Sequence, residues 1–323
     1  MRVFVTGASG HIGAALLPEL LAAGHEVVGL ARSDASAAAL TAAGADVYRG
    51  SLEHPDSLRR GAAAAGGVIH LAYRHDISLS DPNGFATAAA DDLRAVETIG
   101  AALEASGKPF VIASGTAMLA FLLPPGQVGT EADAFGRDST RPRVASENTA
   151  IALAERGVRS SVVRLTPTVH SSLDRHGFIP RLVGIARDKG VSAYVGEGAN
   201  RWPAVNTFDA ARLFRLALEA APPGSRLHAV DDEGVPFREI AEAIGRGLGL
   251  PVVSIPADEA EAQFGFLGAF VSIDNPTSSA WTRELLGWRP EHPALIPDLE
   301  EGHYFAARRP VARVAGASRN ATS

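Results

Sequence analysis

The glycines of the stretch "VTGASGHIG" constrain the fold of this chain more than any other feature of its sequence. The residues before them, "RVFVT" at 2–6, form a short apolar run rich in valine, as expected for a buried strand. The residues after them, 11–23, have the apolar spacing of a helix, in which Pro18 predicts a kink. A strand that passes through a glycine turn directly into a helix is typical of the start of a strand–helix–strand unit.

The same alternation continues through the first half of the chain. Apolar runs of strand length, rich in Val and Ile and not strictly alternating, indicate strands that are covered on both faces. They stand at residues 26–31, 46–50, 67–73, 109–114 and 160–165, with helical patterns at 55–64, 84–106 and about 143–156 between them. This order predicts an α/β fold with a doubly wound parallel sheet and right-handed crossovers.

The regular alternation weakens after Leu165. An amphipathic helix at 206–220 and a strand at 226–230 are still clear, and 235–255 is typical of a helix followed by a strand. We therefore expect a large domain and a smaller one. The large domain is assigned to 1–165 with 203–231 returning to it, the small domain to 166–202 and 232–308, and 309–323 to a flexible tail.

Composition excludes several classes of protein. Charged residues make up 20% of the chain and the net charge is -6, so no basic surface for nucleic acid is expected. The absence of cysteine excludes disulfides and thiolate chemistry, and the histidines lack metal-ligand spacing, so no metal site is expected. No apolar run reaches the ~18 residues of a membrane span, and "MRVFVTG" is too short for a signal peptide. We expect a soluble, cytoplasmic protein without a membrane or nucleic-acid partner.

Each glycine of the turn has a physical reason to be there. Gly7 permits the tight turn, Gly10 lets the backbone approach a pyrophosphate, and Gly13 lets the helix pack closely on the sheet. The helix that follows offers unpaired N–H groups and the positive end of its dipole to phosphate. A dinucleotide site is therefore predicted, against the alternative of a merely structural turn. Its residues here are Gly7, Ser9, Gly10, His11, Ile12 and Gly13.

The end of the second strand bears on which dinucleotide binds. An NAD-preferring site has an acid there for the ribose 2′-hydroxyl, whereas Arg32 and Ser33 suit a 2′-phosphate, which favours NADP over NAD. In the alternative, Arg32 is a solvated surface residue and Asp34 supplies the acid. Further strand ends complete the predicted cofactor site or are ordinary strand ends: Ser51 and Leu52 beside the adenine, and Leu71 and Ala72 along the pyrophosphate groove.

The motifs "TGASGHIG", "GSL", "VIHLA", "FVIASGT" and "VVRLTPTVH" together resemble the extended short-chain dehydrogenase/reductase family, which contains sugar-nucleotide epimerases and dehydratases. The resemblance covers roughly residues 1–255. It implies a Rossmann domain with strand order 3-2-1-4-5-6-7 and a small C-terminal substrate domain that closes over the nicotinamide. It further implies nicotinamide contacts at Pro167 and Thr168, and a homodimer formed through helices 84–106 and 143–156.

One family motif is missing. Family members carry Tyr-x-x-x-Lys on the helix before the sixth strand. The tyrosine is the proton donor, and the lysine lowers the pKa of that tyrosine. If Ser146 aligns with the serine that often precedes that lysine, Arg143 replaces the tyrosine and Glu147 the lysine. Arginine can stabilise an oxyanion but is a poor proton shuttle. In the alternative interpretation, Arg143 and Glu147 form an i, i+4 ion pair on a solvated helix face.

A substitute donor is expected at the carboxyl ends of the strands, where ligands of doubly wound sheets bind. The candidates are Tyr73 with His75, Ser114 and Thr116, and His170. We predict that Tyr73 donates the proton and that Ser114 or Thr116 orients the carbonyl, although strict alignment places Gly115 at the family's hydroxyl position. In the alternatives, Tyr73 packs with its hydroxyl in water and His170 is a satisfied pocket histidine. His176, Arg201 and Trp202 could face the substrate or pack within the small domain.

These observations predict an NADP-dependent oxidoreductase that transfers hydride to or from a small carbonyl, alcohol or imine substrate. A second hypothesis is a catalytically silent NADP-binding sensor or scaffold, for which the missing tyrosine and lysine are the main argument. A third is a sugar-nucleotide epimerase or dehydratase, which needs basic residues in the small domain, where Arg175, Arg181 and Arg201 are available.

Overall fold

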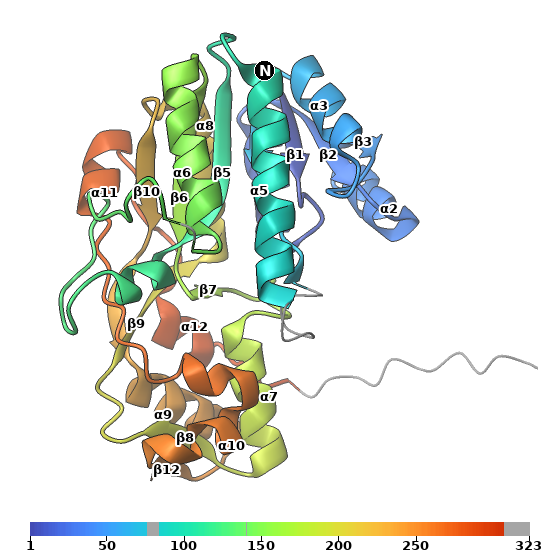
Figure 1. Ribbon diagram of the computed structural model, residues 1–323. Coiled ribbons are helices and arrows are strands. Elements are labelled where there is room, and N and C mark those ends of the chain that lie inside the picture. The colour runs from blue at the N-terminus through green and yellow to red at the C-terminus, as the bar shows by residue number, and fades with distance from the viewer. Residues whose placement is uncertain (76–83, 140, 307–323) are drawn as a thin grey trace, which may run out of the picture.

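The computed structural model describes residues 1–75, 84–139 and 141–306, and its centre is a seven-stranded parallel sheet (Figure 1). The strand order is β10-β6-β5-β4-β1-β2-β3, with β10 as the seventh strand, so the predicted Rossmann order is confirmed. The bounds are β1 (Arg2–Thr6), β2 (Glu26–Ala31), β3 (Asp46–Arg49), β4 (Gly67–His70), β5 (Pro109–Gly115), β6 (Arg159–Leu165) and β10 (Ser225–Ala229). All neighbouring pairs in this sheet are parallel.

Helices cover both faces of this sheet, as the doubly wound pattern predicted. One face packs on α1 (His11–Ala22), α2 (Asp34–Ala42) and α8 (Thr207–Ala220) through a single apolar core. The other face packs on α3 (Pro55–Ala64), α5 (Gly84–Leu103) and α6 (Val144–Ala152), which continues into the 3-10 turn η2 (Leu153–Arg156). Because both faces are buried, the inner strands need apolar residues at successive positions, which is the pattern that the sequence shows.

The smaller body lies beneath the large sheet in Figure 1 and has its own core around Trp202 and Phe237. Its strands form a three-stranded sheet, β11-β9-β7, and a two-stranded one, β12-β8. The strands are β7 (Thr168–His170), β8 (Ser192–Val195), β9 (Arg201–Asn206), β11 (Asp232–Pro236) and β12 (Val252–Ile255). The helices are α7 (Phe178–Lys189), α9 (Phe237–Leu248), η3 (Ala257–Glu259), α10 (Ala260–Phe264), η4 (Gly265–Ala269) and α12 (Leu295–Glu300).

Two segments link the bodies. Strand β9 pairs with β7 and β11 of the small body, while its Val205 belongs to the core of the large body. Helix α11 (Ala280–Leu286) contacts α8 and β10. The Trp288 indole is fully buried in the large core and donates its N–H to the Asp209 carbonyl at 3.0 Å. The expected flexible tail, 309–323, lies outside the described residues.

Two local features matter for the site. Strand β4 ends at His70 rather than at residue 73, so Leu71, Ala72 and Tyr73 leave the sheet at its carboxyl edge. The 3-10 helix η1 (Thr116–Phe121) follows β5 directly at the same edge. Among the described residues, none of the helices has both the length and the apolar character that a membrane crossing requires.

Candidate active site

The glycine turn lies between the ends of β1 and β4. Gly7 has φ +69°, and a Cβ there would lie 2.7 Å from the Ala72 nitrogen, so both the conformation and the contact require glycine. A Cβ on Gly13 would lie 2.4 Å from the Ala8 carbonyl oxygen. At the start of α1, Gly10 provides no side-chain cap. The structure thus forms a backbone cradle with helix amides that are left for a ligand, as a pyrophosphate would require.

The other predicted residues of the turn lie beside this cradle. Ser9 is exposed, whereas Ile12 is half-buried and packs against the core between the large sheet and helices α1, α2 and α8. Leu71 and Ala72 come next to the turn because the N–H groups of both bond to Thr6, at 3.1 Å to its carbonyl and 3.3 Å to its hydroxyl. The turn and the end of β4 therefore form one continuous surface.

His11 connects the glycine turn to the small body, which the sequence did not indicate. Its Nε2 lies 2.7 Å from the Thr207 hydroxyl, and its Nδ1 lies 3.9 Å from an Asp174 carboxylate oxygen. Burial lowers the pKa of His11, although Asp174 opposes that shift. Burial also raises the pKa of Asp174, whose carboxylate accepts a hydrogen bond from the Tyr304 hydroxyl at 3.4 Å.

At the other end of the predicted cofactor site, Ser33 caps α2 by accepting the Ser36 N–H at 3.1 Å. The Asp34 carboxylate is paired with Arg49 at 2.6 Å. In the β2–β3 register Ala31 lies opposite Arg49, so the side chain of Arg49 starts next to the strand end that carries Arg32.

The predicted adenine neighbours lie close to the start of α3. Ser51 has a buried hydroxyl without a hydrogen-bond partner in the described structure. Leu52 packs against the core between the sheet and α3.

Tyr73 and Arg143 lie face to face, although 70 positions separate them in the sequence. The guanidinium carbon of Arg143 is 4.4 Å from the centre of the Tyr73 ring. The Tyr73 hydroxyl is buried and has no hydrogen-bond partner among the described residues. Burial raises the pKa of Tyr73, whereas the charge of Arg143 lowers it. This tyrosine is directly next to Ala72, which contacts the glycine turn.

An ion pair with Asp92 and a hydrogen bond to the Ala113 carbonyl hold the Arg143 guanidinium. One Nη lies 2.9 Å from Asp92 of α5, and the other donates to the Ala113 carbonyl of β5 at 2.9 Å. Asp92 is 3% exposed and also lies 3.3 Å from His70, whose other ring nitrogen is 2.6 Å from the Thr6 hydroxyl. Although burial alone raises the pKa of Asp92, Arg143 and His70 hold it below its usual range.

Glu147 pairs with Arg164 and Arg226 and lies buried, which differs from the alternative of an i, i+4 pair with Arg143 on a solvated helix face. The Glu147 carboxylate is 7% exposed and accepts hydrogen bonds from Arg164 of β6, Arg226 of β10 and the Ser114 hydroxyl. Although burial alone raises the pKa of Glu147, these partners lower it. The position of the family's lysine is therefore occupied by a buried carboxylate that neighbouring strands neutralise.

The remaining predicted catalytic residues are buried and contact other residues of the protein, although the His170 Nε2 has no hydrogen-bond partner in the described structure. The Ser114 hydroxyl donates to Glu147 at 2.9 Å, and Thr116 is fully buried and accepts from Asn275 at 3.2 Å. His170 is fully buried, with Nδ1 2.9 Å from an Asp298 carboxylate oxygen. The Thr168 hydroxyl donates to the Pro203 carbonyl. Each of these side chains supports the site from within, and the half-buried Pro167 precedes Thr168 at its edge.

The residues expected to face the substrate from the small body divide into three cases. Trp202 is 2% exposed and belongs to the core of the small body, so it faces no solvent. Arg201 pairs with Asp274 at 2.8 Å. His176 is exposed.

His228 provides a test of the buried charge network. Its Nδ1 donates to the Ser278 carbonyl at 2.7 Å, so its Nε2, 3.2 Å from Arg164, accepts a hydrogen bond. Burial and Arg164 lower the pKa of His228 to about 4. The unfolded chain binds a proton here near pH 6.5 and the folded chain does not, so stability must fall as the pH drops from 6.5 to about 4.

Glutamine in His228→Gln can keep both hydrogen bonds but does not titrate. Between pH 6.5 and about 4, we therefore expect the free energy of unfolding to fall by less in His228→Gln than in the wild type. The expected difference between the two losses is on the order of 3 kcal/mol. Urea unfolding at both ends of the interval measures the difference. His54→Gln, at an exposed position, is the control. Equal losses in His228→Gln and the wild type would contradict the assignment of the acid sensitivity to His228.

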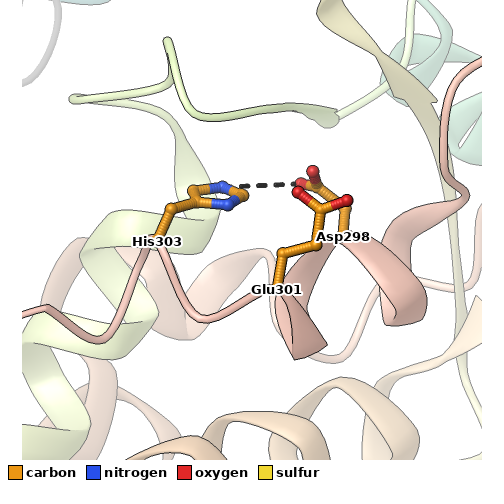
Figure 2. A group of neighbouring side chains, drawn as sticks. All are labelled: Asp298, Glu301 and His303. Atoms are coloured by element: carbon orange, nitrogen blue, oxygen red, sulfur yellow. Dashed lines mark ion pairs between the residues drawn. The ribbon is translucent and has the colours of Figure 1, made fainter.

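Among the described residues, one group could hold a metal ion, although the sequence predicted none. The ligand atoms of Asp298, Glu301 and His303 lie within 4.8 Å of one another, and Figure 2 shows the three side chains converging at the end of α12. The carboxylate of Asp298 already lies 2.9 Å from His170 and 3.7 Å from His303. These ion pairs account for its burial without an ion.

Comparison with known proteins gives three findings. A model of the NAD dependent epimerase/dehydratase family matches residues 3–228. An uncharacterised protein of Schizosaccharomyces pombe is 48% identical over 94% of this chain and 100% of its own length. The 4-hydroxy-2-methyl-3-oxo-4-farnesyl-3,4-dihydroquinoline-1-oxide ketoreductase of Stigmatella aurantiaca is 28% identical over 81% of this chain and 78% of its own length.

The fold is similar to that of a solved enzyme structure. A dTDP-glucose 4,6-dehydratase of Streptomyces venezuelae, with NAD and TYD bound, superposes with a TM-score of 0.74. The similarity covers 94% of this chain and 96% of that one at 20% identity. The glycine cradle described above thus lies in a fold that binds NAD in that protein.

Proposed function

This chain belongs to the NAD dependent epimerase/dehydratase family and is an NAD(P)-dependent oxidoreductase-type enzyme, and from this premise we propose that it uses NADP to reduce a small carbonyl or imine, or to oxidise the corresponding alcohol or amine. The observation that carries the proposal is the position of Tyr73. Its buried, unpartnered hydroxyl lies next to the cradle that fits a dinucleotide, at the sheet edge where nicotinamide enzymes of this architecture react.

The chemistry requires one proton donor from the protein. The cradle at Gly7 and Gly13 would hold a dinucleotide, and its reduced nicotinamide would supply hydride to the carbonyl carbon, whose oxygen then needs a proton. Tyr73 transfers its hydroxyl proton to that oxygen and becomes a phenolate, which regains a proton from solvent. Ser114 and Thr116 do not serve as donors in this proposal, because the Ser114 hydroxyl donates to Glu147 and the Thr116 side chain is fully buried.

The preference for NADP is supported by the charges at the ends of β2 and β3. Arg32 follows β2, and Arg49 ends β3 next to it in the sheet register. A 2′-phosphate there would meet two guanidinium groups, and Asp34, the alternative acid, is already neutralised by Arg49. Ser33 adds a hydroxyl at the start of α2.

Arg32→Asp tests this preference. We expect the Kd for NADPH to rise by roughly 10- to 100-fold, because a charged hydrogen bond to the 2′-phosphate is replaced by repulsion, while the Kd for NADH changes little. Isothermal titration calorimetry with both coenzymes measures the two values. The control is Arg238→Asp on α9, distant in sequence and exposed. An equal loss of affinity for both coenzymes would contradict a 2′-phosphate contact.

Consumption of NADPH against a panel of ketones, aldehydes and imines tests the function itself. Turnover of at least one carbonyl or imine compound is expected, in addition to coenzyme binding. Tight NADPH binding without turnover on any panel member would instead support a sensor or scaffold, for which the missing tyrosine and lysine are the argument. Absence of binding by either coenzyme would reject both functions.

A further inference from the structure

We propose that Arg143 takes over the role of the family's missing lysine, although Glu147 stands at the position of that lysine: it positions Tyr73 by lying over its ring, and it stabilises the phenolate that proton transfer leaves behind. This inference rests on the proposed function, in which Tyr73 is the proton donor. It assigns to Arg143 a role in the reaction that requires no contact with the substrate.

The backbone at Arg143 indicates that the arrangement is specified. Arg143 has φ +70°, and Ala105 is the other non-glycine residue with positive φ among the described residues. A residue with a Cβ is strained in this region by about 1 kcal/mol or more, and such strain persists only where the surroundings enforce it. Here α6 begins directly after Arg143, so the unusual turn sets the direction in which its side chain leaves the helix.

The side-chain contacts hold the guanidinium over the Tyr73 ring. Asp92 and the Ala113 carbonyl bind its two terminal nitrogens at 2.9 Å each, from different elements of the large body. With these two contacts in place, the guanidinium carbon lies over the ring, 4.4 Å from its centre. A guanidinium in this position attracts the ring face, and it attracts a phenolate oxygen more strongly than a neutral hydroxyl.

Among the described groups around Tyr73, Arg143 is positioned to stabilise the phenolate form of the tyrosine. Asp92, which faces it from α5, opposes ionisation of the tyrosine, and burial opposes it as well. From its own loop come His75, with its ring centre 4.9 Å away, and Arg74, which pairs with Glu53 at 2.7 Å and approaches Asp91. Arg143 is therefore the cation against the tyrosine ring, and its charge does not vary over the pH range in which enzymes work.

A difference titration of the phenolate absorbance tests the inference without any substrate. The near-ultraviolet spectrum of each protein is followed with pH, and the spectrum of the same protein carrying Tyr73→Phe is subtracted, which isolates Tyr73 from the other three tyrosines. We expect Arg143→Gln to raise the pKa of Tyr73 by about one unit or more. Arg143→Lys, which keeps the charge, should recover part of this shift.

The control is a second pair of the same kind. Arg238 lies over the Tyr194 ring at 5.5 Å on the surface of the small body, so Arg238→Gln removes an arginine from a tyrosine without touching the site. The Tyr73 titration should be unchanged in that variant. If Arg143→Gln does not fold, as judged by circular dichroism, Arg143→Met is the second variant, because its unbranched side chain fills similar space without the charge.

The outcomes separate this inference from the proposed function. An unchanged Tyr73 titration in Arg143→Gln or Arg143→Met would overturn the inference, even if Tyr73 proves essential for turnover. A raised Tyr73 pKa in either variant supports the proposed effect of Arg143 on Tyr73, independently of any turnover. Where turnover is found, kcat should fall about 10-fold in Arg143→Gln with KM for NADPH little changed, and Arg143→Lys should recover activity in parallel with the titration.

Discussion

Tyr73→Phe should lower kcat for NADPH-dependent reduction by roughly 100- to 10,000-fold, the usual contribution of a general acid, while the Kd for NADPH stays within about two-fold. The change removes only a hydroxyl that has no hydrogen-bond partner in the described structure, so the ring can keep its contact with Arg143. Stability should therefore be nearly unaffected. Steady-state kinetics together with calorimetric titration of NADPH measures both quantities on the same preparation.

The matched control is Tyr194→Phe on β8 of the small body, where a tyrosine also lies beneath an arginine. Its turnover should equal that of the wild type. Retention of wild-type kcat in Tyr73→Phe would remove Tyr73 as the proton donor. A large rise in the Kd for NADPH with little change in kcat would show that the hydroxyl serves coenzyme binding instead of proton transfer.

Arg164→Met should lower the free energy of unfolding by about 3–5 kcal/mol, the largest effect on stability that we expect from a single side chain in this protein. Arg164 is 2% exposed and donates to the Glu147 carboxylate and to the Asp133 carbonyl at 2.8 Å. Its removal leaves a buried carboxylate with Arg226 as its remaining cation among the described residues. Urea unfolding at neutral pH measures the loss.

Two further variants sharpen this test. Arg164→Met combined with Glu147→Met removes both charges, and much of the lost stability should return because no buried carboxylate is left unpaired. Arg246→Met breaks the exposed pair with Glu300 and should cost less than about 1 kcal/mol. A loss in Arg164→Met no greater than in Arg246→Met would show that the buried network does not stabilise the fold.

The strands of the large sheet could be predicted from local signals, whereas their order was implied by the family resemblance. Strands buried on both faces leave continuous apolar runs, and the glycine turn marks where the first strand enters a helix. Contacts between distant segments could not be predicted in this way. Trp288 contacts the large core and donates its N–H to the Asp209 carbonyl, and no local pattern indicates either contact. Helix α2 was not predicted, since its alanine-rich sequence has little amphipathic pattern.

The candidate site shows the same limit. The sequence singled out Tyr73 and Arg143 separately, but their contact depends on how β4 and α6 are placed by the sheet. Asp92 and Arg164 were missed altogether. A signal for them existed, because Asp92 interrupts an apolar helix face and Arg164 interrupts a buried strand, and a charge in such a place needs a partner. The identity of the partner could not be read from the sequence.

The chain passes between the two bodies more than once, and this interleaving bears on how the molecule can come apart. After β9 the chain returns through α8 and β10 to the large sheet. After η4 it returns again through α11 and then reaches α12 of the small body. Neither body is a contiguous fragment that could be excised by cutting one linker. Because several chain segments join the two cores, we expect both cores to lose their structure in one transition when the protein is denatured.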